Sequence, residues 1–111
     1  MTGIMDPKTF RMNGNIKHQM ISILVDLGST HNFLQPNVAK LLRLPILAIQ
    51  PFRVMVGNGE FLECTGCYKQ VAITIQNINF HIDCFVLPIK GADLVLGVQW
   101  LKSLGPVTVD Y

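Results

Sequence analysis

Charged side chains are scarce in this sequence. Asp, Glu, Lys and Arg make up 14% of its 111 residues, apolar residues make up 50%, and the net charge is +2. The basic residues are dispersed and form no Lys/Arg run, which excludes the electrostatic footprint of a nucleic-acid-binding domain. We therefore expect no nucleic-acid partner. The low charge instead indicates an unusually complete core or an apolar surface that meets a partner.

Features that mark secreted and membrane proteins are also missing. The three cysteines, Cys64, Cys67 and Cys84, are an odd number, which argues against a disulfide framework. There is no N-x-[ST] acceptor and no apolar stretch of signal-peptide length at the start. The longest apolar segment, "LLRLPILAI" (residues 41–49), is interrupted by an arginine and a proline, so it does not span a bilayer. We expect an intracellular protein with no membrane partner.

Strand-forming segments separated by turn residues dominate the chain. The segments that predict strands are residues 10–26, 52–66, 68–87, 94–96 and 107–111. We expect the first segment to fold back at Asn13-Gly14, a dipeptide that favours tight hairpins, and the third to fold back at the "QNIN" turn. Together these predict about seven strands, mostly antiparallel, in a single domain over residues 1–111.

One or two short helices complete the predicted fold. Residues 35–44 can form a helical turn that begins near Pro36 and ends at Pro45. A second short helix is expected after Gly97, within residues 92–105. Both follow an apolar strand that ends near a glycine, "LVDLG" and "LVLG", a weak sign of an internal repeat.

An acid stands at the end of the most apolar strand. Asp26 follows a run of β-formers and precedes Gly28 and a cluster of small polar residues. One interpretation is an Asx-turn or a helix cap. The other is a catalytic carboxylate on a rigid strand end, oriented by backbone N–H groups of the Gly28 turn. A single carboxylate hydrolyses little, whereas a pair that shares one proton acts as acid and base, so a twofold dimer would have to supply the second.

Three segments together resemble the retropepsin-like aspartic protease domain. They are "ILVDLGSTHNFLQPNVAKLL" (residues 23–42), "VMVGNGEFLECTG" (residues 54–66) and "FVLPIKGADLVLGVQWLKSLGPVTVDY" (residues 85–111). The resemblance runs from about residue 3 to residue 111 and is closest to the version in gypsy-type long-terminal-repeat retrotransposon polyproteins, particularly those of plants. It implies a closed, mostly antiparallel all-β barrel with one or two short helices. It also implies an aspartic endopeptidase that works as a homodimer on extended polyprotein segments, with no cofactor and no metal.

The resemblance also assigns roles to residues, position by position. Asp26 matches the catalytic aspartate, and the active-site loop continues through Leu27, Gly28, Ser29 and Thr30. The flap over bound peptide matches Val56, Gly57, Asn58, Gly59 and Glu60. The strand that supports the catalytic loop matches Val95, Leu96 and Gly97.

One position departs from the family pattern. Where relatives carry Thr or Ser after the catalytic aspartate, this chain carries Leu27. In the family that hydroxyl hydrogen-bonds across the dimer axis, and Leu neither donates nor accepts. The alternative function is therefore a catalytically silent retropepsin fold that binds peptides or self-associates.

Two further groups of residues suggest other chemistry. Cys64-x-x-Cys67 with His81-x-x-Cys84 has spacing that superficially suggests zinc, but residues three apart on a strand point to opposite faces, so we expect no metal site. His31 lies close to Asp26, where the family motif also carries a histidine that is not the base. We interpret His31 as a local hydrogen-bonding partner of Asn32.

Overall fold

The computed structural model describes residues 9–56, 59–98 and 100. It contains one helix, α1 (Pro36–Leu41), within that part of the chain. The strands are β1 (Thr9–Ile16), β2 (Gln19–Asp26), β3 (Phe33–Leu34), β4 (Leu47–Met55), β5 (Phe61–Ile75), β6 (Ile78–Val86) and β7 (Leu94–Leu96).

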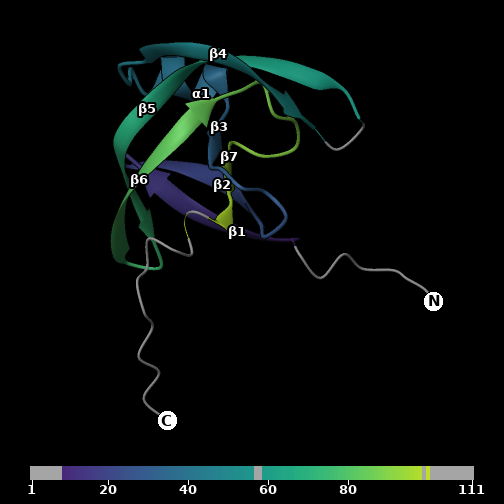
Figure 1. Cartoon of the computed structure of the whole chain (residues 1–111). Coiled ribbons are helices and arrows are strands. Elements are labelled where there is room, and N and C mark those ends of the chain that lie inside the picture. The colour runs from purple at the N-terminus through teal and green to yellow at the C-terminus, as the bar shows by residue number, and fades with distance from the viewer. Residues whose placement is uncertain (1–8, 57–58, 99, 101–111) are drawn as a thin grey trace, which may run out of the picture.

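The strands form one sheet that closes on itself. Their order is β1-β2-β7-β3-β6-β5-β4. A further pairing of β1 with β5, at Asn15 and Thr74, closes the first six strands of this order into a ring, and β4 lies outside it, paired with β5 alone. In Figure 1, β1, β2 and β7 lie in the lower part of the molecule and β4 crosses its top. The prediction of a closed, mostly β fold is confirmed. The expected antiparallel character holds for the hairpins, but β2 pairs with β7, and β3 with β6, in parallel.

The predicted turn at Asn13-Gly14 is wrong. Both residues lie inside β1, where Asn13 pairs with Ser22 of β2. The chain reverses instead at Lys17 and His18, whose φ angles are +51° and +66°. Two successive left-handed residues suit the twist of a two-residue hairpin, although Asn and Gly adopt that conformation more readily.

Gly14 is needed for the closure of the sheet, not for a turn. A Cβ atom at this position would lie 2.7 Å from Cδ1 of the buried Ile23 and 3.0 Å from the carbonyl oxygen of Thr74. Thr74 belongs to β5 and lies opposite the neighbouring Asn15. A residue without a side chain therefore lets β5 approach β1 where the ring closes.

The other predicted hairpins and the first helix are confirmed. β4 and β5 form the second hairpin, and β5 and β6 reverse at Gln76 and Asn77, within the "QNIN" segment. α1 begins at Pro36, where the side chain of Gln35 accepts a hydrogen bond from a backbone N–H of the first turn. The predicted strand at residues 107–111, and most of the second helix, lie outside the described residues. Within the described part of the chain, no helix is long and apolar enough to cross a membrane.

Buried side chains form two clusters. The larger one fills the ring of strands and includes Ile23, Tyr68, Ile73, Leu94 and Leu96. The smaller one lies beneath the β4–β5 hairpin, with Phe33, Cys64, Leu87 and Val95 buried and Phe52, Val54, Leu62 and Phe85 packed against them. The strand ends that carry the candidate site lie between these clusters.

We predict that Gly14→Ala lowers the free energy of unfolding by about 1–3 kcal/mol, because a methyl group has no room between Ile23 and the Thr74 carbonyl. Asn13→Ala is the matched control, since Asn13 is exposed, and its effect should stay within about 0.5 kcal/mol. Urea unfolding of both variants measures the difference. An equal loss in both would favour a turn at these residues over the observed register.

Candidate active site

Asp26 is the last residue of β2 and projects from a rigid strand end. β2 is held on one side by β1, where Thr9 pairs with Asp26, and on the other by β7, where Leu96 pairs with Val25. The Gly28 N–H donates to Oδ1 of Asp26 at 2.9 Å. This hydrogen bond orients the carboxylate, as expected, and it also makes the turn an Asx-turn. An Asx-turn and an oriented carboxylate at the strand end are therefore compatible interpretations of Asp26.

The carboxylate of Asp26 opens into a cleft of about 920 Å³. Most of its walls are apolar and come from β3, β4, β5 and the segment before β7. The lining residues include Ser29, Thr30, His31, Phe33, Phe52, Val54, Val56, Leu62, Leu87, Ile89 and Val95. Asp26 is the only acid that lines the cleft in the described part of the chain, and Arg53 and Lys90 are its basic residues.

The predicted supporting strand lies directly beside the loop that follows Asp26. Val95 pairs with Leu24 on one side and with Phe33 on the other. At Gly97 the two segments are so close that a Cβ atom would lie 2.5 Å from the His31 carbonyl oxygen and 2.6 Å from that of Ser29. Glycine is therefore the one residue type that allows this approach, because any other residue would place a Cβ atom against these two carbonyl oxygens.

Asn32 connects the loop after Asp26 to the neighbouring strands. The sequence predicts for it only a contact with His31. Asn32 is 3% exposed and, apart from tyrosine, tryptophan and cysteine, is the only buried residue with a polar side chain in the described part of the chain. Its Oδ1 accepts a hydrogen bond from the Gly97 N–H at 2.8 Å, and its Nδ2 donates to the Asp83 carbonyl at 3.0 Å. One amide thus connects the active-site loop to β6 and to the end of β7.

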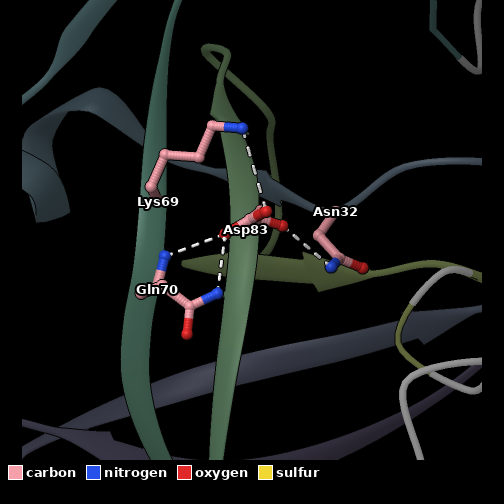
Figure 2. A network of polar contacts seen from close by, with 4 residues as sticks. All are labelled: Asn32, Lys69, Gln70 and Asp83. Carbon is pink, nitrogen blue, oxygen red and sulfur yellow. Dashed lines mark hydrogen bonds and ion pairs between the residues drawn. The ribbon is translucent and has the colours of Figure 1, made fainter.

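The strand that receives the Asn32 bond is itself braced by the side chain of Asp83, as Figure 2 shows. Its Oδ1 accepts a hydrogen bond at 2.8 Å from the backbone N–H of Gln70, whose φ of +55° marks an irregularity in the β5–β6 ladder. The Lys69 ammonium lies 4.0 Å from Oδ2, with both side chains more than half exposed. That ion pair adds little stability, so the Gln70 bond is the important one.

The predicted hydrogen bond between His31 and Asn32 is wrong. Both polar groups of the Asn32 side chain are directed to Gly97 and Asp83. The buried Nδ1 of His31 has no hydrogen-bond partner among the described residues. Its ring instead packs edge-to-face against Phe85, with centroids 5.2 Å apart. Phe52 and Phe85 lie on β4 and β6, far from His31 in the sequence. The residues that neighbour His31 in the sequence therefore do not predict these contacts.

The described parts of the predicted flap form the expected hairpin. The Val56 N–H donates to the Glu60 carbonyl at 2.9 Å, and Gly59 adopts a φ of +85°, which favours glycine. Val56 also lines the cleft. Gly57 and Asn58 lie outside the described residues.

The remaining loop residues differ in exposure. Ser29 donates its hydroxyl to the His31 carbonyl at 2.7 Å, and its own N–H donates to the Asp26 carbonyl. Thr30 is exposed. Leu27 is 41% exposed, a large value for an apolar side chain next to a strand end. This exposure leaves Leu27 available to a second chain.

The cysteines and histidine that suggested zinc do not come together. His81 is exposed on β6, whereas Cys84 of the same strand points into the core, as expected for residues three apart. Burial raises the pKa of the Cys84 thiol to about 12. Cys64 belongs to the other buried cluster. In residues 9–56, 59–98 and 100 no group of three or more His, Cys, Asp or Glu side chains could hold a metal ion.

Asp26 therefore lies on a closed β fold, is oriented by a glycine turn and faces an apolar cleft. The family model for retroviral aspartyl protease matches residues 8–109, and the chain belongs to that family. No curated protein matches the chain significantly.

Two solved structures share the fold. The EIAV protease in complex with the inhibitor HBY-793 is 19% identical, with a TM-score of 0.68 over 94% of this chain and 95% of that one. The retroviral protease-like domain of Ddi1 from Leishmania major is 16% identical, with a TM-score of 0.65 over 87% of this chain and 78% of that one.

We predict that Asn32→Ala destabilises the fold by about 2–4 kcal/mol, because it leaves the Gly97 N–H and the Asp83 carbonyl without their partner. Asn37→Ala is the matched control, since Asn37 is exposed on α1. Thermal and urea unfolding measure both changes. A loss below about 1 kcal/mol for Asn32→Ala would show that the amide is not a major support of the site.

Proposed function

We propose that this chain is an aspartic endopeptidase that acts as a homodimer. The observation that carries the proposal is the placement of Asp26: it is oriented by Gly28, it faces an apolar cleft, and it is the only acid lining that cleft in the described residues. Hydrolysis by paired carboxylates needs a second acid. A second copy of the chain, related by a twofold axis, supplies it.

The two Asp26 carboxylates divide the chemistry between them. The ionised one takes a proton from a water molecule held between the subunits, and the protonated one polarises the carbonyl of the scissile peptide bond. The substrate lies extended along the cleft and adds as a strand beneath the β4–β5 hairpin. Apolar walls formed by side chains such as Val54, Leu62 and Ile89 favour peptides with large apolar residues near the scissile bond.

For the natural substrate we propose the polyprotein of a gypsy-type long-terminal-repeat retrotransposon, cut inside the cell. The support is the motif "DLGSTHNF" at residues 26–33 and its likeness to the domains of such elements. The membership in the retroviral aspartyl protease family agrees with a polyprotein substrate.

A second candidate function is peptide binding or self-association without catalysis. The observation that favours it is Leu27, an exposed apolar residue beside Asp26 where relatives carry a hydroxyl. A dimer without the cross-axis hydrogen bonds is weaker, and a chain that stays monomeric has one carboxylate in each cleft. The two candidate functions therefore differ in whether peptide bonds are cut.

We predict that Asp26→Asn reduces peptide cleavage by about 10²–10⁴-fold, because an amide does not exchange the proton that the pair must share. Asp83→Asn, at an acid outside the cleft, is the control and should retain most of the activity, since an amide oxygen still accepts the Gln70 hydrogen bond. The wild-type rate should fall on both sides of an acidic maximum, since one carboxylate must be ionised and the other protonated. Cleavage unaffected by Asp26→Asn would refute the aspartic mechanism.

We predict that Leu27→Thr strengthens the dimer, because a hydroxyl in each subunit restores two cross-axis hydrogen bonds, together about 1–3 kcal/mol. The dissociation constant should fall by roughly one to two decades. Sedimentation over a dilution series measures this, with Leu41→Thr, on the exposed face of α1, as the control. A variant that dissociates more readily than the wild type would mean that Leu27 itself makes a stabilising apolar contact across the axis.

A further inference from the structure

Three aromatic rings form one wall of the cleft beside Asp26. His31, Phe33 and Phe52 all line it, and we call this wall the aromatic subsite. The His31 ring lies 6.4 Å from each of the two phenylalanine rings, at interplanar angles of 85° and 72°. Phe85 does not line the cleft but packs behind the wall, 4.9 Å from Phe52. With Phe85 included, the four rings come from three separate segments, so their mutual packing sets the orientation of each.

His31 is the one member of the aromatic subsite that carries hydrogen-bonding atoms. Its Nδ1 is buried, while the residue as a whole stays partly exposed and lines the cleft. Nε2, on the far side of the ring, is the nitrogen that remains accessible. The edge-to-face contact with Phe85 favours this orientation of the ring.

We propose that His31 determines specificity, and that the aromatic subsite takes a tyrosine side chain of the peptide with its hydroxyl on Nε2 of His31. This inference rests on the proposed function and names the substrate side chain that the same cleft selects. A planar ring extends the edge-to-face packing of His31 against Phe33 and Phe52. The tyrosine hydroxyl can donate or accept a hydrogen bond, so it can pair with Nε2 whether or not that nitrogen carries a proton.

Phenylalanine fits the same wall less well. Its ring has the shape that the subsite accepts, but it displaces water from Nε2 and leaves that atom without a partner. A site that hydrogen-bonds a substrate hydroxyl discriminates against the analogue that lacks it. The cleft is open, so we expect a preference of about three- to tenfold for tyrosine over phenylalanine, not the much larger factors of closed sites.

The test measures binding apart from cleavage. The probes are fluorescein-labelled octapeptides of Val, Leu and Ala that carry one tyrosine at each position in turn, and the same set with phenylalanine. Fluorescence anisotropy with the Asp26→Asn protein, which binds without cutting, should show tighter binding of the tyrosine peptide at one position by about three- to tenfold. In the Asp26→Asn protein that also carries His31→Phe, the ratio should fall to about one.

Two further variants keep the test specific. His81→Phe, at an exposed histidine of β6 outside the cleft, should leave the ratio as it is in the Asp26→Asn protein. His31→Gln, which retains hydrogen-bonding groups without the ring, should keep part of the preference and serves if His31→Phe does not fold. Thermal unfolding of each variant monitors the fold.

The outcomes separate this inference from the proposed function. Equal binding of both peptide sets at every position, a preference that survives His31→Phe, or no peptide binding at all would each overturn the role of His31. Tyrosine-selective binding by a wild-type chain that cuts none of the peptides would refute the endopeptidase and leave the assigned specificity standing. Cleavage of the peptides without any preference for tyrosine would support the endopeptidase and refute the role of His31 in specificity.

Discussion

The amide of Asn32 is the interaction on which the candidate site depends. It is the place where the loop after Asp26, the end of β7 and the middle of β6 are joined by hydrogen bonds of 2.8 and 3.0 Å. Gly97 can lie against this loop because it has no side chain, and the amide fixes it there through its N–H. Buried polar groups of this kind cost little when every partner is present and a great deal when one is missing. The loop that follows Asp26 is thus held by contacts made away from the carboxylate, while Gly28 and the pairing of β2 position Asp26 directly.

Most of the apolar residues that line the cleft belong to the smaller hydrophobic cluster. Phe33 and Val95 are buried in that cluster and also line the cleft, and Val54 and Leu62 of the β4–β5 hairpin do both in part. A substitution that enlarges the cleft therefore also removes packing from the fold. Any change of substrate preference in this protein is coupled to its stability, because each methyl group on the wall contributes to both.

Local chemistry explains what could be predicted from the sequence. The strand that ends at Asp26 and the reversal at Gln76-Asn77 depend on neighbouring residues, and both were found. Gly14 was assigned to a turn because a glycine required by the approach of Thr74 looks the same in sequence as one that bends the chain. The role of Asn32 could not be inferred from spacing, since its partner Gly97 is 65 residues away. The assignment of roles to the active-site loop came from resemblance, and the structure adds where those residues lie.

Cys84 makes the integrity of this arrangement observable by its chemistry. It follows Asp83, the residue whose carbonyl receives the Asn32 bond, and its burial raises the pKa of the thiol to about 12. Because the thiolate is the reactive form and the side chain is only 2% exposed, we expect slow alkylation of Cys84 at neutral pH while β6 stays in place. Alkylation at Cys84 therefore proceeds through local opening of the strand, and its rate reports the free energy of that opening. The chain thus carries a reporter group one residue from the hydrogen bond that supports the loop after Asp26.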